Sequence, residues 1–257
     1  MILPMIRQHR GQLTVYIILG IIILATIGVL YSNRKPVVQT QDTEPTIVEA
    51  RTRITRIVSD CLQQGFEESM QNIGLVGNPD SREVILFNDS SVAVLYNGNR
   101  LNLPSLNEYA SHIGGGSIHP FKQCIADIPS IPNDMTIDYS GLAFLVYFDE
   151  TATSMQAKIP VTVLAGRGEI KLLDFKASAP VAFLKLHSIV TNYLLKAASD
   201  PYLIPFDPLL FQDVSSAWYP LDSSSILIQL KDPDSSINGK PWPFQFAMKY
   251  TDGGERA

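Results

Sequence analysis

Two cysteines and two histidines, Cys61, His112, His119 and Cys124, are the side chains of this sequence that could together hold a metal ion. Zinc ligands recur at short, regular spacings, and the gaps between these four residues match none of those patterns. We therefore predict no metal site and no cofactor. The two cysteines favour one disulfide if the domain lies outside the cytoplasm, and two buried thiols if it lies inside.

Two segments match ligand-binding loops only in part. Residues 114–117 (GGGS) lack the lysine and the spacing of a phosphate-binding loop, so they predict a connector between two short helices. Asp232, Asp234 and Asn238 begin like a calcium loop, but the glycine comes late and the final glutamate is missing. A turn between two strands explains their composition better.

No residue is marked as a catalytic nucleophile. The chain contains no Gly-x-Ser-x-Gly pentad, the signature of a hydrolase serine. His187 falls one residue from the apolar stripe of an expected helix, which indicates a structural role. The pair Asp149-Glu150 follows an expected strand and is interpreted as solvated. We predict no catalytic residues.

Aromatic residues gather in the last quarter of the chain, at Trp218, Tyr219, Trp242, Phe244 and Phe246. Phe244 and Phe246 alternate to one face of an expected strand, which favours a place in the core. Trp218 and Trp242 stand beside prolines and turns. They are therefore the candidates for an exposed surface that binds a carbohydrate.

The charge balance excludes one class of partner. Residues 47–257 hold 16 of the 20 Lys and Arg residues and 23 of the 25 Asp and Glu residues, a net charge of −7. A nucleic-acid partner requires a basic surface that neutralises phosphates. We therefore predict no nucleic-acid partner.

Residues 13–31 form a run of 19 residues without a charge. As a helix, this run would span roughly 28 Å, close to the hydrocarbon thickness of a bilayer. It follows a short basic leader, 1–12, and precedes a polar linker, 32–46, which is the arrangement of a signal-anchor. We expect a single-pass membrane protein with an extracellular C-terminal domain, and Asn88 in a glycosylation sequon agrees with that location.

The tripeptide Arg10-Gly11-Gln12 directly before the apolar run resembles the class III signal peptide of archaeal type IV pilin-like proteins. That resemblance implies cleavage between Gly11 and Gln12 by a prepilin-type peptidase. Many pilins carry glutamate at the fifth mature position, where it can neutralise the terminal amine of a neighbouring subunit. Tyr16 stands there in this chain, a departure that argues against filament assembly.

A second resemblance covers most of the chain. The leader and apolar run, the segment SDCLQQGFEESMQNIGL, the segment FKQCIAD, a strand-rich middle and the segment INGKPWPFQFAMKY are similar to a group of uncharacterised, membrane-anchored archaeal surface proteins. The resemblance implies the architecture but no chemistry.

Helical periodicity predicts two long helices. Over 47–73, apolar residues recur at spacings of three, four and seven, and Cys61 lies on the resulting stripe. The second long helix covers 181–198. Two short helices are expected between them. One begins at Ser105 with a capping-box pattern, and the other, 119–127, carries Cys124.

Alternating or continuous apolar runs predict strands. The expected strands are 83–87, 91–96, 100–103, 135–139, 143–149, 155–165, 169–175, 225–231 and 244–250. Most would join their sequence neighbours and pair antiparallel. A turn from Asp232 to Lys240 is expected between the last two strands.

The predicted fold class is therefore α+β, with an N-terminal transmembrane helix and a mostly antiparallel-sheet ectodomain over 47–257. A break between subdomains is expected near 128–134. We interpret the chain as a cell-surface protein with a structural, adhesive or minor pilin-like role. Its partners would be the bilayer, through 13–31, and a protein or glycan. A tethered extracellular enzyme acting on envelope polymers and a carbohydrate-binding module remain alternatives.

Overall fold

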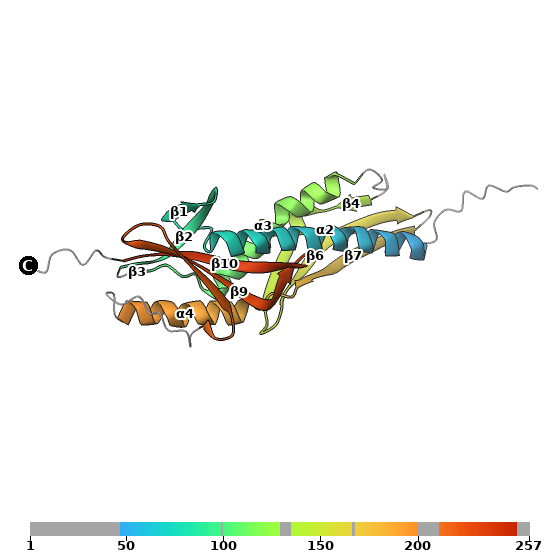
Figure 1. Ribbon diagram of the computed structural model, residues 1–257. Coiled ribbons are helices and arrows are strands. Elements are labelled where there is room, and N and C mark those ends of the chain that lie inside the picture. Colours follow the sequence, from blue (N-terminus) through green and yellow to red (C-terminus); the bar gives the residue numbers. More distant parts are fainter. Residues whose placement is uncertain (1–46, 99, 129–134, 166–167, 200–210, 251–257) are drawn as a thin grey trace, which may run out of the picture. The chain divides into compact units, whose positions relative to one another are not determined.

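The computed structural model describes residues 47–98, 100–128, 135–165, 168–199 and 211–250 (Figure 1). They all belong to one compact unit, Pro45–Ala257. The leader 1–12, the apolar run 13–31 and the linker 32–46 lie outside the described residues. Most of the expected break near 128–134 lies outside them too.

The predicted fold class needs correction. The described ranges contain no helix that is both long enough and apolar enough to cross a bilayer, and the predicted transmembrane segment 13–31 is not among them. What the structure describes is an α+β unit with three α-helices and two sheets, one of which contains a parallel pair of strands.

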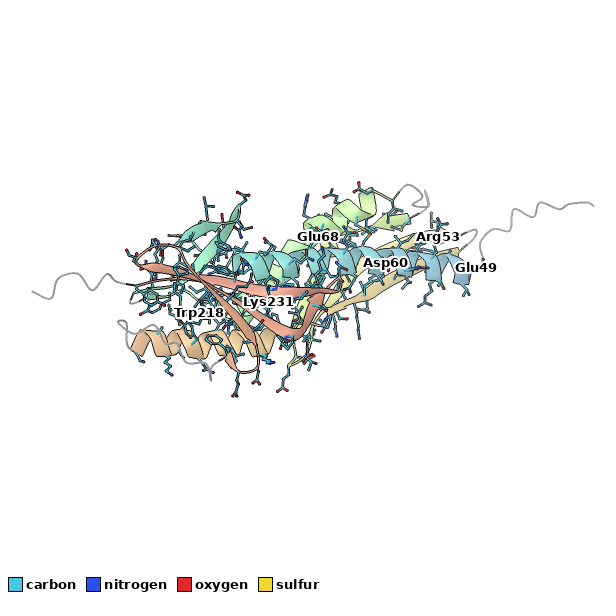
Figure 2. The ribbon with its side chains drawn as sticks, in the orientation of Figure 1. Glu49, Arg53, Asp60, Glu68, Trp218 and Lys231 are labelled. Carbon is cyan, nitrogen blue, oxygen red and sulfur yellow. A yellow bond between two sulfur atoms is a disulfide. The ribbon has the colours of Figure 1, made fainter. Side chains whose placement is uncertain are left out.

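Helix α2, Ile47–Val76, confirms the amphipathic pattern. Its apolar stripe is buried, including Ile54, Val58, Phe66 and Met70, and it packs on strands of both sheets. Charged residues occupy its opposite, exposed face: Glu49, Arg53, Asp60 and Glu68 (Figure 2). The helix therefore joins the two sheets along one side.

Helix α3, Leu106–Ala126, begins as predicted. Ser105 caps it, and the Glu108 carboxylate accepts a hydrogen bond from the Ser105 backbone N–H at 2.7 Å. The expected break at 114–116 is wrong, because α3 continues through these glycines and through Pro120. The prediction of two short helices, with Cys124 on the second, is replaced by one helix.

Close packing explains why the glycines lie inside α3. A Cβ atom at Gly116 would lie 2.5 Å from the Ser69 hydroxyl of α2, and one at Gly65 of α2 would lie 2.7 Å from the Ser117 carbonyl oxygen. The Ser69 hydroxyl also donates to the Ile113 carbonyl at 3.0 Å. Small residues thus let the two helix backbones approach, and this contact offsets the weak helix propensity of glycine.

The larger sheet has six strands in the order β1-β2-β10-β9-β8, with β3 also paired to β2. Only β2 and β10 run parallel among its strand pairs. The strands are β1, Val84–Phe87; β2, Ser90–Asn97; β3, Arg100–Leu101; β8, Ser215–Pro220; β9, Ser225–Ile237; and β10, Lys240–Lys249. Its central strands, β2, β9 and β10, are buried on both faces.

Helix α4, Phe183–Ser199, packs on this sheet through Tyr193, whose ring lies 6.3 Å from that of Phe246. Val94, Ala247, Leu227 and Tyr219 are register partners in turn across four strands, so they share the other face. At the end of that row the ring of Phe87 lies 5.1 Å from that of Tyr219. The outer strands β1 and β8 therefore meet, and the sheet curls over its own apolar row.

The smaller sheet consists of β4, Met135–Ile137; β5, Ala143–Phe148; β6, Thr153–Ala165; and β7, Gly168–Ala179. Strand β7 pairs along one side of β6, while β4 and β5 share the other side. A short 3-10 helix, Tyr139–Gly141, joins β4 to β5. Helices α2 and α3 pack against its strands, whereas Leu145, Tyr147, Leu164 and Leu173 are exposed.

The last hairpin differs from its prediction. The expected turn over 232–240 is mostly strand, because β9 continues to Ile237 and β10 begins at Lys240. Only Asn238 and Gly239 turn, both with positive φ (52° and 71°), the conformation that an Asn-Gly hairpin turn adopts. Strand β8 was not predicted at all.

Candidate functional site

A polar hollow of about 650 Å³ opens where α2 ends, β1 begins and α3 starts. It combines amide, carboxylate, guanidinium and imidazole groups with two apolar residues. The residues that line it are Asn78, Asp80, Ser81, Arg82, Glu83, Asn97, Arg100, Asn102, Leu103, Pro104, Glu108 and His112. We call this feature the polar hollow. Its residues come from a segment between elements, from the expected strands 83–87 and 100–103, and from the helix expected to begin at Ser105.

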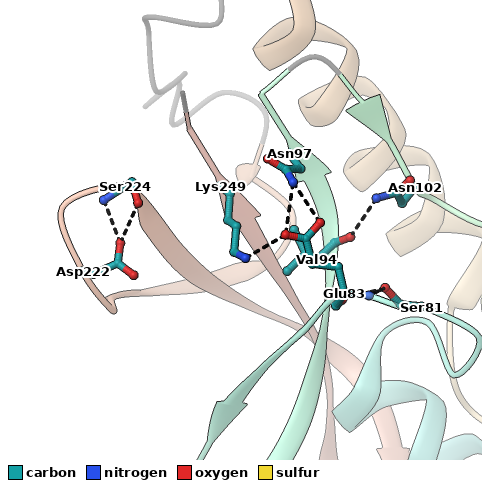
Figure 3. A network of polar contacts seen from close by, with 8 residues as sticks. All are labelled: Ser81, Glu83, Val94, Asn97, Asn102, Asp222, Ser224 and Lys249. Carbon is teal, nitrogen blue, oxygen red and sulfur yellow. Dashed lines mark hydrogen bonds and ion pairs between the residues drawn. The ribbon is translucent and has the colours of Figure 1, made fainter. Parts of the chain in front are cut away.

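Glu83 organises one wall of the polar hollow (Figure 3). Its carboxylate accepts hydrogen bonds from Lys249 Nζ of β10 at 2.7 Å and from Asn97 Nδ2 of β2 at 2.9 Å. The hydrogen bond from Lys249 is the main reason that the pKa of Glu83 is lowered, although partial burial opposes it. Glu83 therefore stays ionised and ties the start of β1 to the ends of two strands.

Asn102 and Asn78 fix the backbone of the same wall, next to strand β2. The Asn102 backbone N–H donates to the Leu95 carbonyl at 2.8 Å, and its side-chain amide reaches the Val94 carbonyl at 3.4 Å. Asn78 Nδ2 donates to the Asn102 carbonyl at 3.2 Å. These hydrogen bonds join backbone and side-chain amides to backbone carbonyls of the protein. This part of the wall is therefore fixed before a ligand binds.

The first turns of α3 supply the opposite wall. His112 Nε2 lies 3.2 Å from Asp80 Oδ2, and the imidazole is about one-fifth exposed. His112 also lines a second hollow, of about 530 Å³, between α2 and α3. Hydrogen bonds from the Ser105 backbone and hydroxyl lower the pKa of Glu108, so this cap carries a negative charge at the rim.

Charges of both signs line the polar hollow. The carboxylates of Asp80, Glu83 and Glu108 share its lining with the guanidinium groups of Arg82 and Arg100 and the imidazole of His112. A strongly charged ligand would meet repulsion from one set. A neutral, polyhydroxylated ligand can instead donate to carboxylates and accept from guanidinium groups, while Leu103 and Pro104 offer apolar contact.

The predicted disulfide is confirmed. Cys61 of α2 and Cys124 of α3 are bonded, with their Cα atoms 5.4 Å apart. The described residues contain no other cysteine. The bond links α2 to α3, and Cys124 lines a hollow of about 410 Å³ together with Gln64 and Glu68 of α2.

The expected tryptophan platform is corrected. Trp242 is only 1% exposed, and its Nε1–H donates to the Met70 carbonyl of α2 at 2.9 Å. It is a core residue and cannot present a surface. Trp218 is half-buried between the rings of Tyr193 and Phe211, each about 5.7 Å away. The structure therefore does not bring the two tryptophans together on one exposed face.

Asp232 belongs to the core rather than to a cation loop. Its carboxylate accepts hydrogen bonds from Lys185 Nζ at 2.8 Å and from the Ser235 hydroxyl at 2.7 Å. Burial works to raise the pKa of Asp232, but these two hydrogen bonds outweigh it and lower the pKa. Asp234 lines a hollow beside Lys185. Across the described ranges, no three His, Cys, Asp or Glu side chains gather as metal ligands do.

The remaining predicted site residues fall in two groups. Asn88 is exposed in the turn between β1 and β2, where it and Asp89 both have positive φ (47° and 62°). An oligosaccharide transferase could reach this position, and glycosylation remains a prediction. Gly11 and Gln12, the expected processing site, lie outside the described residues.

Sequence reasoning missed the polar hollow because its residues come from four separate segments. The capping-box pattern that begins at Ser105 was a local signal, and it placed Glu108 in the first turn of a helix. Neither Lys249 nor His112 is marked by its neighbours in the sequence.

No family model, no curated protein and no solved structure matches this chain.

Proposed function

We propose that this protein is an adhesive protein of the cell surface and that its polar hollow binds a neutral saccharide. The observation that carries the proposal is the polar hollow itself, a preorganised site of about 650 Å³ with charges of both signs. Saccharide recognition needs many hydrogen bonds of fixed direction and little net charge. Glycans of a neighbouring cell or of the envelope are the corresponding partners.

The disulfide supports an extracytoplasmic location, since structural disulfides persist in oxidising compartments. The bond between Cys61 and Cys124 would be reduced in most cytoplasms. The uncharged run 13–31 supports attachment to a lipid bilayer. The resemblance of Arg10-Gly11-Gln12 to a class III signal peptide adds a pilin-like export route, with cleavage before Gln12.

Binding follows from the geometry of the two walls. Arg100 would donate two parallel hydrogen bonds to adjacent hydroxyl groups, as a planar guanidinium can. The carboxylates of Asp80 and Glu108 would accept hydroxyl hydrogens from the other side. Leu103 and Pro104 would contact the apolar C–H groups of the sugar ring.

The second candidate function is a tethered extracellular enzyme acting on envelope polymers. The observation that favours it is His112, which contacts Asp80 at 3.2 Å and opens into the polar hollow. An imidazole held by a carboxylate can act as a general base. Cleavage of a bound oligosaccharide that is lost in His112→Gln, with binding retained, would favour the enzyme.

Calorimetric titration of the full chain in detergent with neutral oligosaccharides tests the adhesive role. Arg100→Ala should weaken binding by about tenfold or more, the loss of a charge-assisted hydrogen bond. The matched control is Arg51→Ala, which removes an exposed arginine of α2 away from the polar hollow. Equal binding by both variants, or no saccharide binding at all, would overturn the proposal.

A further inference from the structure

The two outer edges of the four-stranded sheet differ in how their backbones are satisfied. On β7, the Gln63 side chain of α2 covers the edge at Ser178. Gln63 Oε1 accepts from the Ser178 N–H at 3.0 Å, and Gln63 Nε2 donates to the Ser178 carbonyl at 2.8 Å. One amide thus imitates a neighbouring strand. On the opposite side, β5 pairs only with β6 among the described residues.

The outward groups of β5 can be assigned from its ladder. The Asp149 N–H donates to the Ala152 carbonyl at 2.9 Å, which closes the hairpin with a bonded pair. Bonded and non-bonded pairs alternate in an antiparallel ladder. The N–H and C=O groups of Phe148, Val146 and Phe144 therefore point away from β6, toward the open edge.

The Gln63 contact independently gives the same assignment of outward and inward backbone groups on β5. Ser178 turns its groups away from β6, so its register partner Ser154 must turn its own groups toward β5. Ser154 is opposite Tyr147. Tyr147 is therefore bonded to β6, and its neighbours Val146 and Phe148 face outward.

Strand β5 also lacks the features that usually protect an edge. Its sequence, AFLVYF, contains no charge and no proline, and natural edge strands commonly carry one or the other. Leu145 and Tyr147 are 55% and 45% exposed on the outer face. Phe144, Val146 and Phe148 on the inner face remain only partly buried.

We propose that β5 pairs antiparallel with β5 of a second copy of this chain, about a two-fold axis at Val146. In that register Val146 meets its own counterpart and Phe144 meets the second copy's Phe148, so all the outward backbone groups are paired. Opposed residues then share a face in both copies, as the pleat requires. Leu145 lies opposite the second copy's Tyr147, an aliphatic–aromatic pair of the kind that stabilises sheets.

Charge complementarity selects a second copy over an unrelated strand. The register places Asp149 opposite the second copy's Ala143, and Ala143 is the partner of Lys158 on β6. Asp149 and the second copy's Lys158 therefore share one outer-face row, two strand spacings or roughly 10 Å apart. Both are exposed. The small Ala143 lets the lysine reach across it, and the two-fold axis makes the contact twice.

Cysteine cross-linking of the full chain in detergent tests the register. Leu145→Cys with Tyr147→Cys should give a disulfide-linked dimer under mild oxidation, since opposed residues of a non-bonded pair lie about 4.5 Å apart. Either single variant should cross-link at least about tenfold less, because its cysteines are not opposed. The control, Leu164→Cys with Leu173→Cys, has matched exposure of 56% and 47% on the same face and should stay monomeric.

A charge exchange tests the contact itself by sedimentation. Asp149→Lys should weaken the dimer about fivefold to tenfold, and adding Lys158→Asp should restore it to within about twofold. A monomeric full chain, equal cross-linking in the control, or no recovery in the exchanged variant would overturn the proposal. Cross-links from residues 145 and 147 to a different protein would overturn it as well.

Discussion

The two sheets of this protein differ in how far their faces are buried and in how their outer strands are paired. The six-stranded sheet buries both faces of its central strands and brings its outer strands together through Phe87 and Tyr219. The four-stranded sheet exposes large apolar side chains on one face, and within the described ranges its strand β5 pairs on one side only. The comparison separates a region built for stability from one whose surface is left available for contact.

The largest expected effect contrasts one side chain from each sheet. Trp242→Ala should lower the free energy of unfolding by about 3–5 kcal/mol, because it empties a core site and removes the hydrogen bond from the indole to the Met70 carbonyl. Leu164→Ala on the exposed face of the four-stranded sheet, outside the proposed dimer contact, should change it by less than about 0.5 kcal/mol. Denaturant unfolding followed by far-ultraviolet circular dichroism measures both. Similar losses would contradict the contrast.

Removing the disulfide tests how firmly α2 and α3 hold the two sheets. Cys61→Ala with Cys124→Ala should cost about 2–4 kcal/mol, since the bond closes a loop across a sequence separation of 63 residues. The same denaturant midpoint should be reached when the native chain is unfolded in reductant. A much smaller loss would mean that packing alone fixes the two helices.

Substituting alanine for glycine in α2 or α3 should change the free energy of unfolding by a smaller amount, and the sign should depend on the position. Gly65→Ala should destabilise by about 1–3 kcal/mol, because its new methyl would press on the Ser117 carbonyl oxygen and the Phe121 backbone. Gly115→Ala is the control, with nothing near its added Cβ. That variant should stabilise by up to about 1 kcal/mol through helix propensity. Thermal unfolding of the two variants in parallel decides the sign.

The smallest expected effect depends on pH. The pKa of Glu83 is lowered in the folded protein, so its stabilisation is present above the ordinary carboxyl pKa of 4.5 and is lost as pH falls through the folded value. Glu83→Gln should therefore destabilise by less than about 1 kcal/mol at pH 7. The difference from the native chain should shrink below pH 4.5. A constant difference would assign the effect to packing.

Local patterns in the sequence predicted the elements whose cause is local. The stripe of α2 follows from periodicity, and the Ser105 cap follows from a four-residue pattern. The pairing of Cys61 with Cys124 is not local, but it was expected for a domain outside the cytoplasm because the chain has two cysteines. Each of these features depends on residue types that act over one turn or one contact.

Features that depend on tertiary contact were missed. Glycines 114–116 looked like a helix break because the contacts that favour small residues there come from distant segments, Phe144 of β5 for Gly114 and Ser69 of α2 for Gly116. Trp242 looked exposed because prolines flank it, yet the Met70 carbonyl receives its N–H. The parallel pairing of β2 with β10 brings together residues far apart in the sequence, such as Asn97 and Lys249. The polar hollow combines residues 78–83, the β2–β3 hairpin and the start of α3. No pattern within one segment of the sequence predicts a contact with a distant segment.

The amide of Gln63 that covers Ser178 has a consequence for how many copies of the chain can join through this sheet. A sheet with two open edges can add copies at both ends without limit, which is how fibres propagate. On β7 the backbone groups of Ser178 are already bound by a side chain of the same protein, which disfavours addition there relative to β5. The Gln63 contact would therefore favour a closed pair of copies joined through β5 over a chain of sheets that also adds copies at β7.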